Sequence, residues 1–259
     1  MAQKKKTKAM VVSQEKLADG IYDLRLETEL AQDAACGQFV GVYPKDKSTL
    51  LPRPISICEV NKEEGSLRLV YRVAGKGTGE FSVYREGDEI AVLGVLGNGF
   101  PLDKANEGQT AFLMGGGIGV PPILELARQL NCEKKIIVGY RDENCFLQSD
   151  FEKNGQVFIA TEDGSVGTRG NVMDAIRENG LKADVIYACG PMPMLRAIKQ
   201  YALEEDIPAY ISLEERMACG VGACLGCVCR TKDVDAHSHV NNARICTDGP
   251  VFEAREVEI

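Results

Sequence analysis

The chain has 259 residues, 44% of them hydrophobic, which is enough for two domains with buried cores and a smaller appendage. Its formal net charge of −8 argues against nucleic acids and anionic membranes as partners. No apolar run approaches membrane-spanning length, and no signal-peptide core follows the lysines near the start, so we expect a cytoplasmic protein that binds no membrane.

The first hundred residues predict an all-β domain. Short segments rich in β-branched and aromatic residues alternate with Gly, Pro and Asp, as in a small barrel or sandwich. We expect an antiparallel β-barrel domain over residues 1–103, with one short helix at 79–84. The predicted strands cover residues 8–13, 22–27, 38–43, 53–60, 66–73 and 89–93.

Two motifs in this domain suit a diphosphate. The first is the run from Arg53 to Ile57, Arg-Pro-Ile-Ser-Ile, and the second is Gly-Lys-Gly-Thr-Gly from Gly75 to Gly79. A glycine-rich turn that opens a helix presents free N–H groups and a positive dipole end, and Arg53 would add a bidentate charged contact. Each motif alone also fits a purely structural role, as a strand or as a plain turn.

From about residue 109 the pattern changes to alternating strands and helices. This alternation predicts a parallel sheet flanked by helices, with ligands at the carboxyl ends of its strands, in a domain over residues 104–212. The predicted strands are 109–114, 134–140, 156–161, 183–188 and 208–212, and the predicted helices are 120–130, 171–179 and 192–205.

Gly-Gly-Gly-Ile-Gly at residues 115–119 follows the first of these strands and opens a helix, which is the context of a dinucleotide loop. Val120 stands where a strict G-x-G-x-x-G has its last glycine, so a tight turn without a ligand is the alternative. Cys-Gly-Pro at 189–191 follows another strand and should face the same crevice. Asp142 and Glu143 follow the second strand, where acidic residues would repel a 2′-phosphate and favour NAD over NADP.

The segment over residues 213–259 is dominated by cysteines. Cys219, Cys224 and Cys227 follow the C-x4-C-x2-C spacing of plant-type [2Fe–2S] proteins, and Cys246 is the candidate fourth ligand. The segment is too short to fold without help, and a metal centre would supply it. The glycines between these cysteines should let the backbone turn sharply and bring amide N–H groups to the sulfurs; they are Gly220, Gly222 and Gly226.

Zinc and disulfides are the alternatives for this segment. A zinc ribbon usually shows two C-x2-C pairs, whereas this segment has one, and disulfides are rare without export. Cys229 could compete as a ligand, although the C-x2-C spacing favours Cys227. His237 and His239 form an H-x-H pair in a polar stretch, and two ligands make a poor metal site, so we expect an exposed loop. The remaining cysteines are interpreted as small apolar residues: Cys36, Cys58, Cys132 and Cys145.

Taken in order, these motifs resemble those of the ferredoxin-reductase superfamily. Within it the chain is most similar, over essentially its whole length, to the electron-transfer subunits of class 1B dihydroorotate dehydrogenases, the PyrK family. The most specific parts are Cys-Gly-x-Gly-Ala-Cys-x-x-Cys-x-Cys and Cys-x-Asp-Gly-Pro-Val-Phe at 246–252. The spacing between Cys227 and Cys246 is somewhat long for that family.

The resemblance implies a role for each motif. Ser56 would lie near the reactive flavin ring and Cys189 near the nicotinamide, as the two catalytic residues. The implied FAD contacts are Arg53, Pro54, Ile55, Ser56, Val70, Tyr71, Arg72, Gly77 and Thr78. The implied NAD contacts are Gly116, Gly117, Ile118, Gly119, Val120, Gly190, Pro191 and Met192. The implied cluster ligands are Cys219, Cys224, Cys227 and Cys246.

An NAD site, a flavin site and a [2Fe–2S] cluster in one chain form a converter between two-electron and one-electron transfer. The resemblance implies a partner, an FMN-containing catalytic subunit that oxidises dihydroorotate in pyrimidine biosynthesis, in a heterotetramer of two subunits of each kind. One alternative is a related reductase subunit that serves ferredoxin, sulfur or hydrogenase chemistry. Another is a zinc-binding interaction module without catalytic activity, which would be colourless.

Overall fold

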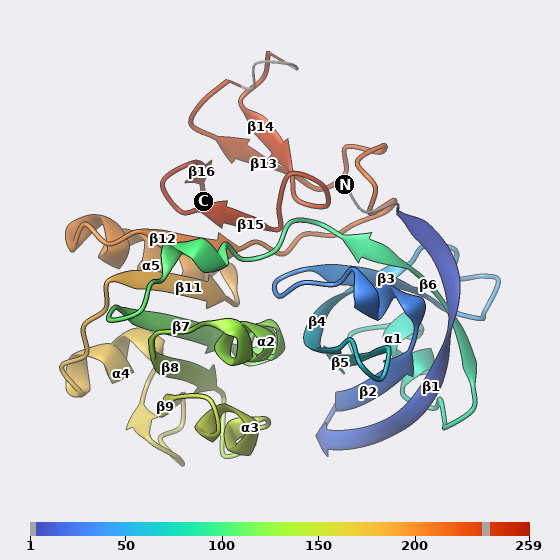
Figure 1. Ribbon diagram of the computed structural model, residues 1–259, viewed down its shortest axis with the longest axis horizontal. Coiled ribbons are helices and arrows are strands. Elements are labelled where there is room, and N and C mark those ends of the chain that lie inside the picture. Colours follow the sequence, from blue (N-terminus) through green and yellow to red (C-terminus); the bar gives the residue numbers. More distant parts are fainter. Residues whose placement is uncertain (1–3, 235–238) are drawn as a thin grey trace.

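The computed structural model describes residues 4–234 and 239–259. It contains a closed barrel, a seven-stranded sheet and a three-stranded sheet (Figure 1). This arrangement confirms the predicted β-barrel, the predicted parallel-sheet domain and the small cysteine-containing part at the C-terminal end. No helix in these described ranges has the length and hydropathy needed to cross a membrane. His237, in the predicted H-x-H loop, lies outside the described residues.

The barrel consists of antiparallel strands in the order β1-β2-β5-β4-β3-β6. Alternate residues along each strand point inward, because successive side chains of a strand face opposite sides. Leu24, Leu26, Val40, Ile57 and Leu69 are among the buried residues that fill the interior. The strands are β1 Lys5–Ala18, β2 Ile21–Glu27, β3 Phe39–Tyr43, β4 Arg53–Asn61, β5 Ser66–Arg72 and β6 Glu89–Leu96.

The short helix of this domain, α1, spans Lys76–Phe81, three residues earlier than the predicted 79–84. The Thr78 hydroxyl accepts hydrogen bonds from the N–H groups of Ala74 and Gly75, at 2.9 and 3.2 Å. These bonds satisfy amides at the start of the helix and fix where it begins. The glycine-rich motif is therefore the first turn of the helix rather than a turn that precedes it.

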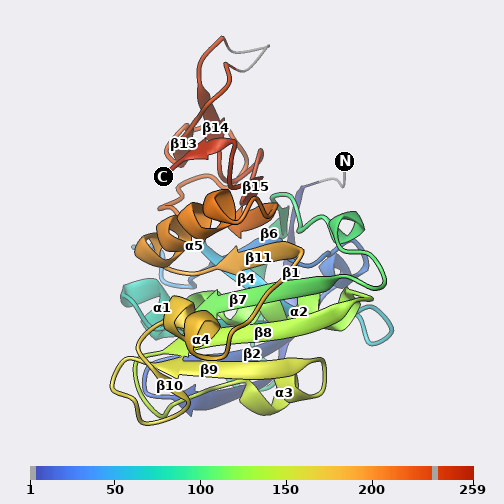
Figure 2. The ribbon, with the colours of Figure 1, turned by 90° about the vertical axis from the view of Figure 1, so that its left-hand side faces the viewer.

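The seven-stranded sheet has the order β10-β9-β8-β7-β11-β12-β15 and is parallel except for its last strand. Two helices lie between the sheet and the barrel, α2 Pro121–Gln129 and α3 Gln148–Glu152 (Figure 1). The opposite face carries α4 Val172–Glu178 and α5 Met192–Glu204 (Figure 2). The strands are β7 Thr110–Gly116, β8 Glu133–Tyr140, β9 Gln156–Thr161, β10 Thr168–Arg169, β11 Val185–Cys189, β12 Ala209–Ser212 and β15 Val251–Glu253.

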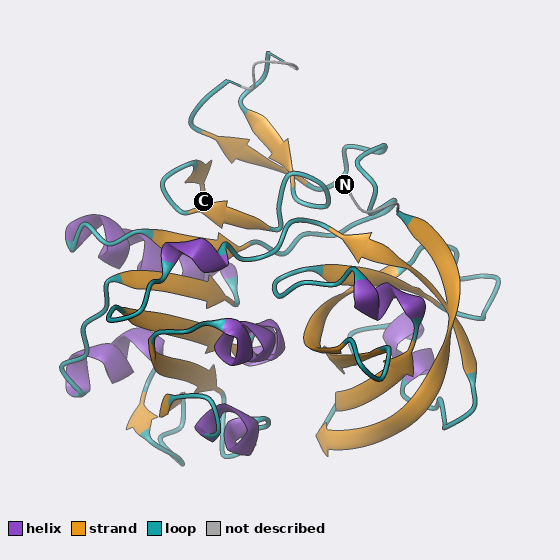
Figure 3. Cartoon of the chain, viewed as in Figure 1, coloured by secondary structure: helices purple, strands orange, loops and turns teal. Residues whose placement is uncertain are grey.

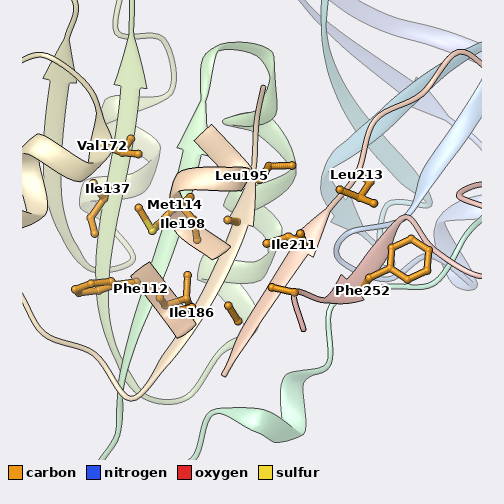
Figure 4. Packing of buried hydrophobic residues seen from close by; sticks show 14 of the residues in the cluster. Phe112, Met114, Ile137, Val172, Ile186, Leu195, Ile198, Ile211, Leu213 and Phe252 are labelled. Atoms are coloured by element: carbon orange, nitrogen blue, oxygen red, sulfur yellow. The ribbon is translucent and has the colours of Figure 1, made fainter. Parts of the chain in front are cut away.

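Each face of this sheet packs against a separate core. Phe112, Met114 and Ile186 meet Leu195 and Ile198 of α5 on the outer face (Figure 4). On the inner face, residues of α2 and α3 pack between the sheet and residues from the barrel side, among them Ile21 and Val70. The helix α2 is thus buried from two sides, which explains its nearly continuous burial from Pro121 to Ala127.

The C-terminal part is tied to the other domains. Its own sheet has the order β14-β13-β16, whereas β15 pairs antiparallel with β12 of the large sheet (Figure 3). Phe252 of β15, Cys227 and Cys246 belong to the same core as α4 and α5. The strand bounds are β13 Val228–Thr231, β14 Asn242–Arg244 and β16 Val257–Glu258. The sequence analysis predicted neither β15 nor this extension of the sheet.

Candidate functional site

The two motifs predicted for a diphosphate lie against each other. A Cβ atom at Gly77 would be 2.7 Å from Nε of Arg53 and 3.0 Å from its Cζ, so a larger residue would push the guanidinium away. Arg53 Nη1 also donates a hydrogen bond to the carbonyl of Leu51 at 2.8 Å. The fold therefore brings a positive charge from β4 onto the first turn of α1, which is the local environment a diphosphate requires.

Within that turn, Thr78 has a structural task. The residue is 8% exposed, and its hydroxyl also donates to the carbonyl of Gly75 at 3.2 Å. Since the hydroxyl is engaged inside the turn, a phosphate contact from this residue would use its backbone.

The three residues expected to form a second flavin contact alternate along β5. The Tyr71 side chain points into the barrel, where its hydroxyl donates to Oε1 of Gln14 at 2.9 Å. Val70 packs in the core shared with α2, on the side of the nucleotide domain. The Arg72 guanidinium reaches the glycine cluster, with Nη2 3.2 Å from the position of a Cβ at Gly117. Arg72 is thus the barrel side chain that borders the nucleotide loop.

The two loops predicted to line one crevice are in direct contact. A Cβ at Gly119 would be 2.6 Å from Cα of Gly190, and a Cβ at Gly116 would be 3.1 Å from Cδ of Pro191. Gly117 has φ +54°, in the left-handed region that favours glycine. Glycines at these positions therefore let the two strand ends approach each other. Val120 is fully buried, so its side chain supports the turn from within.

Cys189 lies at the carboxyl end of β11, beside Ser212 of β12. Its side chain has no exposed surface. Burial raises the pKa of this thiol, as does the charge of Glu214, against a smaller opposite effect of a hydrogen bond with Ser212. The thiol therefore resists ionisation, and it lies fully below the protein surface. Ser56 on β4 is half-buried.

Glu214 is a crevice residue that the sequence analysis did not single out. Its side chain reaches solvent. Burial among surrounding atoms nevertheless raises its pKa, and the charge of Arg72 opposes this effect. The carboxyl lies close enough to Arg72 and Cys189 for their charges and pKa values to influence one another. Its position immediately after a parallel strand was the available signal.

Acidic residues gather where β8 and β9 end. Asp142 accepts hydrogen bonds on Oδ1 from the N–H and the side-chain amide of Asn144, at 3.0 and 2.7 Å. Asp163 accepts from Ser165, and these bonds lower its pKa. Both carboxylates are close enough to Cys145 to raise the pKa of that thiol, after the larger effect of its burial. This edge of the sheet is therefore negatively charged.

The four predicted cluster ligands lie near one another. Cys224 is close enough to Cys219 to lower its pKa, and Cys227 and Cys219 are close enough to Cys246 to raise its pKa. Among the described residues, no group of three or more His, Cys, Asp or Glu side chains could hold a single metal ion. Four thiolates, two for each of two irons, are the donor set of a [2Fe–2S] cluster. The residues present fit the cluster.

Backbone amides of the loop face the sulfurs. The N–H of Val221 lies 3.4 Å from Sγ of Cys219. Burial opposes ionisation of Cys219, but N–H donors of the loop and the Cys224 thiol together lower the pKa of Cys219 to about 6. Cys246 differs, because burial and the neighbouring Cys227 raise its pKa to about 11. Cys219 therefore ionises more readily than an ordinary cysteine, and the thiolate is the form that binds iron.

Two of the three glycines in the cysteine loop have the left-handed backbone conformation that was predicted for them. Gly220 and Gly222 have φ values of +69° and +83°. Gly226 does not have a positive φ, contrary to the prediction, and Leu225 takes φ +56° instead. Cys229 is paired with Ala243 in the small sheet and packs against the core, as expected for a thiol that is not a ligand.

The end of the barrel contacts the cysteine segment at two places, at Gly220 and at the turn after Cys246. The Asn98 N–H and side-chain amide donate to the carbonyls of Gly249 and Asp248, at 2.6 and 2.8 Å. A Cβ at Gly220 would be 3.1 Å from Cδ1 of Leu96, the last residue of β6. The cysteine segment is thus fastened to the domain that carries the Arg53 motif.

Comparisons with known proteins agree with this arrangement. Residues 214–258 match the family described as the iron–sulfur cluster binding domain of dihydroorotate dehydrogenase B. The chain is 45% identical over 250 residues to the dihydroorotate dehydrogenase B (NAD(+)) electron transfer subunit of Lysinibacillus sphaericus (strain C3-41), covering 95% of each. It is also 45% identical over 260 residues to the subunit of the same name from Geobacillus sp. (strain WCH70), covering 98% of each.

Solved structures share the fold. A structure of NADH-dependent reduced ferredoxin–NADP oxidoreductase has a TM-score of 0.86 at 27% identity and covers 96% of this chain and 89% of its own. A ferredoxin NADP+ reductase from Neisseria gonorrhoeae with bound FAD and NADP has a TM-score of 0.65 at 15% identity, over 82% and 94%.

The fold and the cysteine site together define an oxidoreductase subunit of the ferredoxin-reductase type with an iron–sulfur centre. The cofactor set of FAD, a [2Fe–2S] cluster and NAD fits the three sites described above. The chain belongs to the family of electron transfer subunits of dihydroorotate dehydrogenase B (NAD(+)).

Proposed function

We propose that this chain passes electrons between NAD+ and the FMN of a catalytic partner subunit, through FAD and a [2Fe–2S] cluster. The observation that carries this proposal is the junction at Leu96 and Asn98, where the flavin-type barrel touches both halves of the cysteine segment. We therefore propose that the cluster lies between the barrel domain and the partner subunit. FAD, when bound, exchanges two electrons with nicotinamide as a hydride and single electrons with the cluster.

The residues of the chain prepare each of these sites. Arg53 would balance the charge of the diphosphate, together with the backbone of the first turn of α1. Ser56 is proposed to face the flavin ring, and Cys189 to support the nicotinamide site from below. Gly119 and Gly190 let the two loops come into contact, so that the backbones of both could line one nucleotide site. The N–H groups at 221–224 would stabilise charge on the cluster sulfurs.

The surface around the cysteine loop suits a protein partner. Val221, Leu225 and Val228 are 38%, 62% and 42% exposed, although all three are apolar. Exposed apolar residues grouped on the cysteine loop and at the start of β13 favour a protein interface. We propose that the partner is an FMN-containing subunit that oxidises dihydroorotate to orotate in pyrimidine biosynthesis, in an assembly of two plus two subunits. We propose that the protein works in the reducing cytoplasm, where its ten cysteines would remain free of disulfides. We propose no nucleic-acid or membrane partner.

A second candidate is a subunit that exchanges electrons with ferredoxin. It is favoured by the TM-score of 0.86 to NADH-dependent reduced ferredoxin–NADP oxidoreductase. The identity to that protein is 27%, against 45% to the dihydroorotate dehydrogenase subunits, so the dihydroorotate reading is preferred.

Reconstitution with purified partners tests the proposal. The holo-chain is mixed with an FMN-containing dihydroorotate-oxidising subunit, and NADH formation from dihydroorotate and NAD+ is recorded. We expect NADH formation only when both subunits are present. Activity with reduced ferredoxin and none with the dihydroorotate-oxidising subunit would support the second candidate instead.

A further inference from the structure

Glu125, in the middle of α2, is a buried carboxylate that holds the barrel. The residue is 4% exposed. Its Oε2 accepts a hydrogen bond at 3.0 Å from the backbone N–H of Val60, which belongs to β4 of the barrel. Arg128 Nη1 donates to the same oxygen at 2.9 Å, and Gln129 Nε2 donates to Oε1 at 2.6 Å. One side chain of the nucleotide domain thus fixes a strand of the flavin-type domain through its main chain.

Two ion pairs extend this contact across the domain boundary, and a third pair, within the barrel, joins them. Arg128 of α2 pairs with Glu59 of β4 at 3.3 Å. Arg68 of β5 pairs with Asp150 of α3 at 2.9 Å and with Glu59 at 3.3 Å, and its side chain is 9% exposed. These charges form one continuous network between the barrel and the helices that face it. Removing one member of a buried network leaves its partners uncompensated, so such networks favour a single arrangement.

The two elements joined by Glu125 each carry a candidate cofactor motif at one end. The strand β4 begins with the Arg53 to Ser56 run, and α2 begins directly after the glycine cluster. Helices and strands are stiff over such lengths, so a contact in the middle of α2 and near the end of β4 sets the relative position of the two motifs. Glu125 itself belongs to neither motif.

We propose that Glu125 is a positioning residue for hydride transfer, because it sets the distance between the nicotinamide site and the flavin site. This inference rests on the proposed function of the two sites. Hydride transfer needs the reacting atoms roughly 3–3.5 Å apart, and a displacement of about 1 Å can slow a reaction about a hundredfold. Loss of the Glu125 contact would let the domains shift by such an amount without altering either motif.

The test uses the full-length chain loaded with FAD and its cluster, and stopped-flow reduction of the flavin by NADH. Glu125→Ala should slow this step about ten- to a hundredfold, with the apparent Kd for NADH changed by less than about threefold. Glu125→Gln keeps an oxygen that can accept from Val60 and should remain within about threefold of the wild-type rate. Glu178→Ala, an exposed glutamate at the end of α4, is the matched control and should behave as wild type.

A second readout does not depend on activity. Hydrogen exchange at residues 57–61 should be faster in Glu125→Ala than in the control, both with and without FAD. Arg128→Ala breaks the pair with Glu59 but leaves the Val60 contact, so its transfer rate should fall between those of Glu125→Ala and wild type. If Glu125→Ala does not fold, Arg128→Ala is the variant that tests the proposal.

Two results would overturn the inference: a wild-type transfer rate in Glu125→Ala despite faster exchange, or a rate loss that merely follows loss of FAD. In the event that Glu125→Ala does not fold, a wild-type rate in Arg128→Ala would overturn it as well. Failure of the wild-type chain to reduce its flavin with NADH would contradict the proposed function instead, so the two failures are distinguishable.

Discussion

The side-chain amide of Asn98 donates a hydrogen bond of 2.8 Å to the carbonyl of Asp248, and so joins the end of the barrel to the turn that follows Cys246. The contact links parts of the chain that are 150 residues apart. It holds in place the segment that carries Cys246, the proposed fourth cluster ligand.

Asn98→Ala should therefore loosen the cluster. Loss of a side-chain hydrogen bond costs about 1 kcal/mol, or roughly a fivefold faster loss of iron to a chelator. The backbone contact from Asn98 to Gly249 remains, so the chain should still fold. Bleaching of visible absorbance under a chelator measures the rate. Asn106→Ala, in an exposed loop, is the control, and equal rates in the two variants would contradict the role of Asn98.

Arg53→Ala should lower flavin occupancy. The substitution removes the positive charge that lies on Gly77, and a charged contact of this kind contributes about 1.5–3 kcal/mol, so we expect FAD to bind at least about tenfold more weakly. Titration of FAD into the flavin-free chain gives the Kd. Arg85→Ala, on the exposed surface of the same domain, should bind FAD normally. Extracted flavin that proves to be FMN would show that this site is not built for a diphosphate.

Asp142→Asn should weaken the preference for NADH over NADPH. The amide oxygen can still accept the hydrogen bonds from Asn144, while the negative charge that repels a 2′-phosphate is lost. We expect the KM for NADPH to fall about tenfold and that for NADH to change by less than about twofold. Steady-state reduction of a dye with each nucleotide measures both. An unchanged NADPH constant would place the ribose elsewhere.

Cys189→Ala should slow hydride transfer from NADH and leave the iron content unchanged. The residue is fully buried next to Gly119, so its replacement would alter the packing beneath the proposed nicotinamide site. Flavin reduction by NADH and iron analysis on the same sample separate the two effects. Loss of iron from this variant would mean that the assignment of the four ligands is wrong.

Much of the architecture could be predicted because its signals are local. The barrel strands show short apolar alternation between turn residues, and the sheet strands alternate with helices. The strand Val251–Glu253 was missed because three residues carry little pattern and their partner, β12, lies about forty residues earlier. The shift of α1 to Lys76–Phe81 follows from the hydroxyl of Thr78, whose local bonds override the helical periodicity.

The candidate sites also combine features that have a local sequence signal with features that do not. The spacing of Cys219, Cys224 and Cys227 is a local signal, and the structure adds that Cys246 lies close to Cys219 and Cys227. Contacts between distant segments could not be predicted from the sequence, such as the hydrogen bond from Asn98 to the carbonyl of Asp248. The role of Leu225 in the loop was also missed, because a positive φ is rarely expected of leucine.

The central claim is that the cluster lies on the electron path between the two subunits. Cys224→Ser in the assembled complex tests it most directly, with Cys229→Ser as the control that alters a cysteine outside the ligand set. Gel filtration establishes that each complex is intact, since cluster loss could also loosen the C-terminal segment. NADH oxidation with a dye that takes electrons from the flavin should persist in Cys224→Ser, because hydride transfer over roughly 3 Å needs only nicotinamide and flavin.

The decisive measurement is the rate of NAD-linked dihydroorotate oxidation by the intact Cys224→Ser complex. We expect this rate to fall to near zero, while Cys229→Ser keeps the wild-type rate and the partner still oxidises dihydroorotate with an artificial acceptor. Full NAD-linked activity in an intact Cys224→Ser complex would show that electrons bypass the cluster, and would contradict the account.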